Sequence, residues 1–301
     1  MRATIILAAA IAMSAAANAQ QTDWKKIDEV LGRSGALTGD VHRYGFPRTD
    51  LRVTLDGVDI KPALALGGWV AFKPSHDGVM MMGDIVLLET EINPVMTAAV
   101  ENGLEITAIH NHILRAEPLT FYMHISGHGD PQKLADAVHS ALSKSKTPLI
   151  APASSPPTPQ IELNTADLDH IMRAKGKTVG GVYQFGIPRS NQVSQAGMSL
   201  EPSGPLGVAT GINFQPTGKG AAAITGDFVL TDKEINPVIR ILRANNIEVT
   251  ALHSHMLDEQ PRLFFMHFWA NNDALKLATA LRAALDKMAN VESVGHGDQP
   301  K

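Results

Sequence analysis

Short apolar stretches bounded by glycine, proline or polar turn residues recur along the chain, a pattern that predicts β-strands. The clearest stretches form two pairs, one pair in each half of the sequence. They are residues 70–74 and 78–88, then 211–216 and 221–230. Each half also contains an apolar segment that ends in His-x-His, at His110 and His253, and that is followed by a further strand-like segment after a short turn.

Helical patterns open and close each half. We expect short first helices at Asp23–Leu31 and Ala166–Lys175, since each is followed by a glycine and has a threonine at its start that could cap it, Thr22 or Thr165. Apolar positions spaced three and four residues apart predict a closing helix in each half. These positions run from Leu134 to Leu142 and from Leu277 to Leu285.

Two Asn-Pro pairs, at 93–94 and 236–237, predict one more helix in each half. Asparagine is a favourable helix cap and proline suits the first helical position. With these helices, each half is expected to be an α+β unit with a mostly antiparallel sheet.

The two halves are duplicates of each other. Of the 34 aligned residues between Glu91–His124 and Glu234–His267, 16 are identical. A Gly-x-Pro-Arg motif, which ends in Arg48 or Arg189, and a Gly-Asp pair precede this segment in both halves. The chain is therefore expected to contain two tandem repeats of one fold.

The ends of the chain and the join between the repeats differ in composition from the repeats themselves. Arg2, a short apolar run and the ending Ala17-Asn18-Ala19 are typical of a cleavable secretory signal. The segment 144–165 is rich in proline and small residues and is expected to be an extended tether. The predicted organisation is a signal peptide at 1–19, repeat 1 at 20–143, a linker at 144–165, repeat 2 at 166–290 and a tail at 291–301.

Composition narrows the classes of function. The chain has no cysteine, which excludes disulfides and thiolate metal ligands, and its formal charge of −4 is spread without a basic stripe. We therefore expect neither a nucleic acid nor an anionic membrane surface as a partner, and no later segment is long and apolar enough for a membrane span. With the predicted signal, this indicates a periplasmic or secreted protein whose oligomeric state stays open.

Three histidines recur in both repeats and are candidate metal ligands. Residues two apart on a strand point to the same face, so each His-x-His pair should project together, and the third histidine should lie beside it on the next strand. Neutral imidazoles suit a divalent ion, with zinc favoured first and copper second. The predicted ligands are His110, His112 and His124 in repeat 1 and His253, His255 and His267 in repeat 2. The alternative is that these are buried histidines with only structural hydrogen bonds.

Carboxylates near the histidines are candidate catalytic bases. Asp84, like its counterpart Asp227, follows glycine within a strand pattern, where an acid is disfavoured and needs a reason. Glu91 and Glu234 precede the Asn-Pro pairs, where a plain electrostatic helix cap is an equally good interpretation. We name Asp84 and Glu91 as the candidate catalytic residues.

Two other features have structural alternatives. The run Met80-Met81-Met82 would suit Cu(I), but repeat 2 has Ala223-Ile224-Thr225 there, so core packing is favoured. Arg48 and Arg189 could hold an anionic substrate or form structural salt bridges.

The duplicated unit, with Gly-Asp, Glu-Ile-Asn-Pro, His-x-His and Phe-x-Met-His in that order, resembles the LppY/LpqO-type family of exported bacterial proteins. The resemblance covers nearly the whole chain after the predicted signal, but it implies no established activity. The chain lacks the cysteine that lipid attachment would need, so a membrane anchor does not follow from the resemblance.

The sequence supports two hypotheses of different classes. The first is an exported metal-binding protein, extending to metal-dependent hydrolase or lyase chemistry, in which one repeat could be active and the other a scaffold. The second is a binding module for a small-molecule or envelope ligand such as a glycan. The chain has only three tryptophans, which disfavours a sugar platform. Whether the repeats form separate sites or one shared site is open.

Overall fold

The computed structural model describes residues 22–151, 160–201 and 204–289. The predicted signal peptide and the predicted tail from residue 291 lie outside the described residues, as does the middle of the predicted linker. Among the helices of the described ranges, none is long and apolar enough to cross a membrane.

Each repeat contains a six-stranded sheet in which every neighbouring pair is antiparallel, which confirms the predicted α+β fold. The strand order is the same in both sheets. In repeat 1 it is β1 (Ala36–Thr38), β2 (Val41–Pro47), β5 (Gly67–Ser75), β6 (Gly78–Leu88), β8 (Thr120–Gly129) and β7 (Glu105–His110). In repeat 2 it is β9 (Lys177–Val179), β10 (Val182–Ile187), β13 (Thr210–Gly218), β14 (Ala221–Leu230), β16 (Phe264–Asp273) and β15 (Glu248–His253).

Smaller elements connect these strands. A short hairpin leaves each sheet after its second strand and, in repeat 1, a four-residue helix follows the hairpin. These elements are β3 (Val53–Leu55), β4 (Val58–Ile60) and α2 (Pro62–Ala65) in repeat 1, and β11 (Val193–Gln195) and β12 (Met198–Leu200) in repeat 2.

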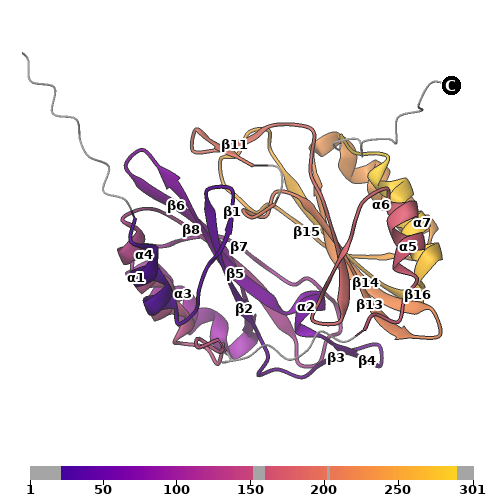
Figure 1. Cartoon of the computed structure of the whole chain (residues 1–301), viewed down its shortest axis with the longest axis horizontal. Coiled ribbons are helices and arrows are strands. Elements are labelled where there is room, and N and C mark those ends of the chain that lie inside the picture. The colour runs from indigo at the N-terminus through magenta and orange to yellow at the C-terminus, as the bar shows by residue number, and fades with distance from the viewer. Residues whose placement is uncertain (1–21, 152–159, 202–203, 290–301) are drawn as a thin grey trace, which may run out of the picture.

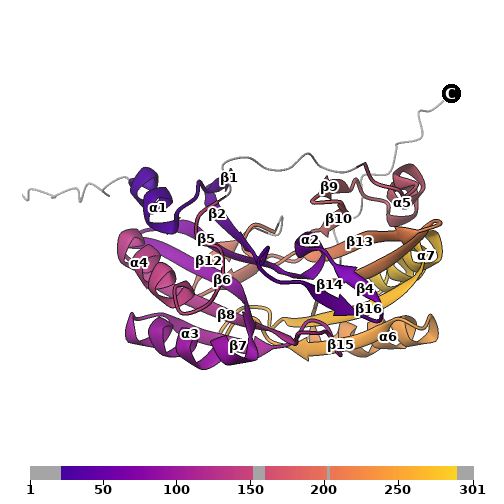
Figure 2. The ribbon, with the colours of Figure 1, turned by 90° about the horizontal axis from the view of Figure 1, so that it is seen from below.

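Helices cover the outer face of each sheet, so the molecule has the layer order helix, sheet, sheet, helix (Figure 1). The helices are α1 (Trp24–Leu31), α3 (Glu89–Glu101) and α4 (Pro131–Leu142) on the first sheet, and α5 (Thr165–Met172), α6 (Asp232–Ala244) and α7 (Ala274–Leu285) on the second. Each set of helices encloses a core of its own with the sheet that it covers. Figure 2 shows that β7 and β15, one from each sheet, meet at the middle of the molecule.

The inner faces of the two sheets pack against the other repeat. Along β5, Val70 and Phe72 belong to the helix-covered core, whereas Trp69 and Ala71 join a buried cluster that includes residues of repeat 2, among them Phe265. This alternation follows from the period of two along a strand. Because both faces of the central strands are apolar and buried, the repeats form one body, and side chains on the inner faces lie between them.

The helices that contain the Asn-Pro pairs begin earlier than predicted. Helix α3 starts at Glu89 and α6 at Asp232, and Pro94 and Pro237 lie inside them. The Glu91 carboxylate accepts a hydrogen bond from the Leu88 backbone amide at 2.9 Å, and Glu234 accepts one from Thr231 at 2.7 Å. The helix start is thus stabilised by a glutamate in the first turn, and the proline removes one later backbone hydrogen bond without ending the helix.

The first helices also differ from the prediction at their ends. The N-caps are Asp23 and Asn164 in place of the predicted threonines, and the Asn164 side chain accepts from the backbone amide of Asp167. Helix α5 ends at Met172 because Arg173 adopts a left-handed conformation, three residues before the predicted end at Lys175.

The beginning of the predicted linker is packed onto repeat 1 and is not a loose tether. The Arg33 guanidinium donates to the backbone carbonyl of Leu149 at 2.7 Å, and the Leu149 side chain packs against the core of repeat 1. The Lys146 backbone amide donates to Glu91. Composition alone does not reveal these contacts, because they depend on residues more than fifty positions away.

Candidate metal centre

The strand ends place three histidines of each repeat on the inner faces. His110 ends β7, and His124 lies on the neighbouring strand β8, with ring centroids 4.9 Å apart. His112 lies in a bend just beyond the end of β7, so the strand is shorter than the prediction had it. Its ring is still 5.1 Å from that of His110. The predicted convergence of the three rings is therefore present in repeat 1.

The six histidines of the two repeats form one shared cluster. Ring centroids lie 3.5 Å apart for His110 and His253 and 3.7 Å apart for His112 and His267, and the same 3.7 Å separates His124 and His255. Each ring of repeat 1 thus contacts a ring of repeat 2, so the histidines of the two repeats lie in one cluster and not in two separate ones.

A reciprocal pair of hydrogen bonds holds the cluster across the interface. The Thr107 hydroxyl donates to the backbone carbonyl of His255 at 2.8 Å, and the Thr250 hydroxyl donates to that of His112. Thr107 and Thr250 are equivalent positions of the repeats, as are His112 and His255. The interface therefore has approximate twofold symmetry centred on the histidines.

Backbone carbonyls fix the protonation of three rings. Nδ1 of His110 lies 3.1 Å from the Asn111 carbonyl, and Nδ1 of His253 lies 2.9 Å from the Ser254 carbonyl. Nδ1 of His267 lies 3.0 Å from the Gly226 carbonyl. A carbonyl oxygen only accepts, so each of these Nδ1 atoms carries a hydrogen, and a ring that is neutral in this form has a free lone pair on Nε2.

These lone pairs face one another. Nε2 of His253 and Nε2 of His267 are 3.0 Å apart, although both rings carry their hydrogen on Nδ1. On the other side, Nε2 of His110 is 2.7 Å from Nε2 of His124, and a hydrogen on Nε2 of His124, whose Nδ1 has no partner, makes this an ordinary hydrogen bond. In the His253–His267 pair, two lone pairs at 3.0 Å repel each other unless a proton or a metal ion lies between them.

Burial keeps five of the six rings neutral. Burial and the neighbouring charges of His253 and His267 lower the pKa of His110 to about 2, and burial followed by His267 lowers that of His253 to about 4. Burial also lowers the pKa of His255 to about 3 and holds the pKa values of His112 and His124 well below their usual range. Neutral imidazole is the form that binds a metal.

Two aspartates on the central strands border the cluster. Asp84 on β6 pairs with His124 across the ladder, and Asp227 on β14 pairs with His267. Asp227 Oδ1 is 2.5 Å from Nδ1 of His267, whereas Asp84 Oδ2 is 3.8 Å from Nε2 of His112. An acidic residue is disfavoured within a strand, and the position of both aspartates beside the histidines explains why they are there.

The two carboxyl groups differ in charge. Burial, together with the charge of Asp227, raises the pKa of Asp84 well above its usual value, against the opposing charge of Arg43. Burial also acts to raise the pKa of Asp227, but the charge and hydrogen bond of His267 outweigh it and the net pKa is lowered. The cluster therefore carries one ionised carboxylate, that of Asp227, on the side of His267.

Glu91 lies outside the cluster. Its carboxylate accepts from the Arg48 guanidinium at 2.7 Å and from the backbone amides of Leu88 and Lys146. Arg189 and Glu234 repeat this pair at 2.9 Å in repeat 2. The helix-cap interpretation of Glu91 and the salt-bridge interpretation of Arg48 thus account for these residues, and the structure gives Glu91 no position from which to act as a base at the histidines.

Two residues at the cluster were missed from the sequence. The Tyr122 ring stacks on His112 with centroids 3.4 Å apart, and the guanidinium of Arg43 lies 3.8 Å from the ring centroid of Trp69 and acts on Asp84 through its charge. Tyr122 precedes His124 by two residues on β8 and so shares its face, a signal that strand periodicity contains. Arg43 has no such local signal.

Replacing Gly226 with alanine should damage the strand pairing that positions Asp227. A Cβ there would lie 1.9 Å from the backbone carbonyl oxygen of Gly211 on β13, and neither backbone can yield without breaking the ladder. We expect a loss of about 1 to 3 kcal/mol or more in the free energy of unfolding, measured by urea denaturation. Gly211→Ala is the matched control, because nothing lies within 4 Å of its Cβ position. Equal stability of the two variants would contradict this reading of the site.

One protein family matches the sequence of both repeats. Residues 25–144 and 166–287 each match the family described as Domain of Unknown Function (DUF1259). The chain belongs to this family. The two matched regions cover most of the described residues of the two repeats, and the description states no activity. No curated protein matches the chain.

Two solved structures show a distant likeness. The trimeric bacterial microcompartment shell protein PduB shares 11% identity, with 87% of this chain and 97% of that chain covered and a TM-score of 0.21. The double-ringed trimeric shell protein MSM0271 from the RMM microcompartment shares 9% identity, with 73% and 87% covered and a TM-score of 0.19. With TM-scores this low, neither likeness bears on what this DUF1259 protein does.

Proposed function

We propose that this protein binds a divalent metal ion in the histidine cluster between its two repeats. The observation that carries the proposal is the pair of Nε2 atoms of His253 and His267, 3.0 Å apart with both hydrogens held on Nδ1 by other groups. A metal ion bound by both nitrogens removes the repulsion between their lone pairs. The carbonyls at Nδ1 are the outer contacts that commonly orient metal-binding imidazoles.

The spacing of the remaining donors supports the same proposal. Ligand atoms of His110, His253 and His267 lie within 4.8 Å of one another, and so do those of His112, Asp227 and His267. Imidazole nitrogens bind zinc at about 2.0 to 2.1 Å, so two ligands of one ion are separated by at most about 4 Å. Small side-chain movements bring these groups into range. His267 belongs to both groups and is the central ligand of the proposed site.

The donor set favours zinc first and copper(II) second. Imidazole nitrogen and carboxylate oxygen suit both ions, and copper(II) is generally bound more tightly by such sites. Asp227 supplies negative charge that offsets the charge of a buried ion. Of the two residues predicted to be catalytic, only Asp84 borders the cluster, so Asp84 is the one that stays a candidate for a metal-assisted hydrolysis or lyase step.

Export is part of the proposal. It is supported by the N-terminal signal pattern ending at Ala19 and by the likeness of the motif order to LppY/LpqO-type exported proteins. Periplasmic fractionation of the tagged full-length chain, followed by N-terminal sequencing, tests it. Retention of residues 1–19 in the mature protein would contradict it.

The metal site is tested by elemental analysis of purified protein. Wild type is expected to retain a divalent ion, zinc or copper(II), and the double variant His253→Ala/His267→Ala is expected to lose that divalent ion. His170→Ala is the matched control, because His170 is an exposed histidine on α5 away from the cluster. Equal content of zinc or copper(II) in wild type and the double variant would overturn the proposal.

A further inference from the structure

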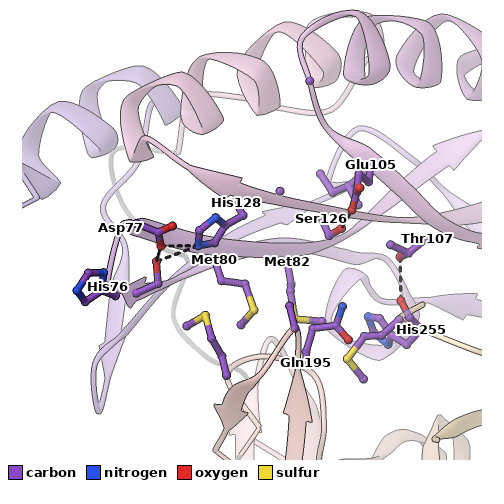
Figure 3. Close-up of a pocket in the computed structure, with 17 residues that line it drawn as sticks. His76, Asp77, Met80, Met82, Glu105, Thr107, Ser126, His128, Gln195 and His255 are labelled. Atoms are coloured by element: carbon purple, nitrogen blue, oxygen red, sulfur yellow. Dashed lines mark hydrogen bonds and ion pairs between the residues drawn. The ribbon is translucent and has the colours of Figure 1, made fainter. Parts of the chain in front are cut away.

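A cavity of about 590 Å³ lies between the repeats and borders the histidine cluster. Figure 3 shows Met80 and Met82 extending from one strand toward Gln195 and His255, which come from the other repeat. His255 belongs to both places, since its ring is 3.7 Å from that of His124 and also lines the cavity. The cavity is therefore continuous with the cluster.

Four methionines line this cavity, and they come from both repeats. Met80 and Met82 lie on β6, Met198 lies on β12, and Met256 follows His255. Met80, Met82 and Met256 belong to one buried cluster, with exposures of 5%, 3% and 2%, and Met198 packs against it. Met81 points to the opposite face and joins the helix-covered core of repeat 1. The core interpretation of the methionine run is confirmed for all three residues, but Met80 and Met82 also line the cavity.

None of the four cavity methionines has a methionine at the equivalent position of the other repeat. The strand registers match Met80 with Ala223 and Met82 with Thr225, because Asp84 and Asp227 hold the same place in their ladders. By the same alignment, Met198 corresponds to Val58 and Met256 to Ile113. The methionine pair that the repeats do share, Met123 and Met266, lies in the two helix-covered cores.

The equivalent region on the other side of the twofold axis is filled with aliphatic side chains. Ile113 and Ala223 belong there to a buried cluster with Leu64 and Ala65 of α2. Duplication would have produced two similar regions. Instead, thioethers from both repeats are concentrated on the side where a cavity remains, which packing alone does not require.

Two buried polar atoms at this cavity lack partners among the described residues. Nε2 of His255 and Oε1 of Gln195 have no hydrogen-bond partner, and His255 is only 6% exposed. Leaving a buried polar atom without a partner costs free energy, so a ligand that contacts it is one explanation. A cation bound by the lone pair of His255 Nε2 would be such a ligand.

We propose that the cavity is a second metal site, which binds Cu(I) through thioethers drawn from the four methionines that line it, with His255 as a nitrogen ligand. Thioether sulfur is a soft ligand that selects Cu(I) over hard divalent ions. The proposal concerns binding alone, with the ion supplied as Cu(I), so no electron transfer is involved. It is independent of the divalent site, although the two sites share the wall formed by His255.

The test replaces thioethers with leucine, which nearly conserves side-chain volume and so preserves packing. The variant Met80→Leu/Met82→Leu/Met198→Leu/Met256→Leu is made in the His253→Ala/His267→Ala background, where the divalent site is removed. Cu(I) is titrated without oxygen into the metal-free protein against a coloured Cu(I) chelator. The background protein is expected to withhold Cu(I) from the chelator, and the leucine variant is expected to lose this ability.

Controls separate the two sites. Met81→Leu in the same background should withhold Cu(I) as the background protein does, since Met81 faces the helix-covered core. The four leucine substitutions in an otherwise wild-type chain should leave zinc content unchanged. Undiminished Cu(I) binding by the leucine variant would overturn the proposal, and so would an equal loss in Met81→Leu. Neither result would bear on the divalent site.

Discussion

Replacing Arg48 with alanine is expected to lower the free energy of unfolding by about 3 to 5 kcal/mol, because it leaves a buried carboxylate without its charge partner. Arg48 is fully buried and its guanidinium donates to Glu91 at 2.7 and 3.2 Å and to the Val86 carbonyl at 2.8 Å. After the substitution, Glu91 retains only the two backbone amides of Leu88 and Lys146. Urea denaturation measures the loss.

Arg115→Ala is the control for this prediction. Arg115 also forms two ion pairs, with Asp56 and Glu248, but its side chain is 49% exposed. Water and salt screen exposed pairs, so the substitution should change stability much less than Arg48→Ala. A similar decrease in the free energy of unfolding in both variants would contradict the prediction, because burial of the Arg48 pair would then add nothing to its contribution.

The Arg48 pair should also give the protein a specific dependence on pH. Burial acts to raise the pKa of Glu91, but the Arg48 hydrogen bond and the two backbone amides outweigh it, so the folded pKa lies below the usual 4.5. A carboxyl with a depressed folded pKa stabilises the fold above its unfolded pKa, and this contribution is lost as pH falls through the folded value. The stability advantage of wild type over Glu91→Gln should therefore shrink as pH is lowered below about 4.5. An advantage that stays constant through this range would contradict it.

The same pair shows why one of the candidate bases could be misassigned from sequence. Duplication preserves Arg48 with Glu91 and Arg189 with Glu234 as faithfully as it preserves the histidines. A glutamate before Asn-Pro is consistent with two roles, that of a helix cap and that of a functional acid. Only the contact between Arg48 and Glu91, 43 positions apart in the sequence, distinguishes them.

The secondary structure was largely readable because its signals are local. Strand 78–88 and helix Leu134–Leu142 follow from apolar periodicity within a few residues, and their observed bounds are close to the expected ones. The helix start at Glu89 was missed because Asn93 and Pro94 resemble a cap and a first turn, whereas the true cap contact is the Leu88 amide with Glu91. Two possible helix starts lie close together in this sequence, and only the folded structure shows that the helix begins at the earlier one.

The arrangement of the repeats was not readable in the same way. The pairing of His110 with His253, and that of His112 with His267, depends on how the sheets of the two repeats pack together. The sequence of β5 does indicate that both of its faces are buried, because Trp69 and Ala71 are apolar on the face opposite Val70 and Phe72. A strand that is apolar on both faces needs a second packing partner, but its sequence does not say that the partner is the other repeat.

Saturating zinc should stabilise the wild-type protein by about 4 kcal/mol when the free ion is at a thousand times its dissociation constant, since the folded state binds it and the unfolded chain largely does not. The reason lies in the origin of the ligands. His110 comes from one repeat and His253 and His267 come from the other, so the assembled site exists only while both repeats are folded and packed together. Thermal and urea unfolding of metal-free protein, with and without added zinc, measure the effect, and a chelator should reverse it.

The same experiment separates a metal site from a structural histidine cluster. His267→Ala should abolish the stabilisation by zinc, because His267 belongs to both groups of candidate ligands, whereas His170→Ala should keep it in full. If the histidines served only as mutually packed rings, zinc would leave the wild-type unfolding curve where it is, and His267→Ala would lower stability equally with and without the ion. Because the ligands join the repeats, zinc should also protect the interface itself: Thr107 and Thr250 amide exchange should slow on zinc addition in wild type and stay unchanged in His267→Ala.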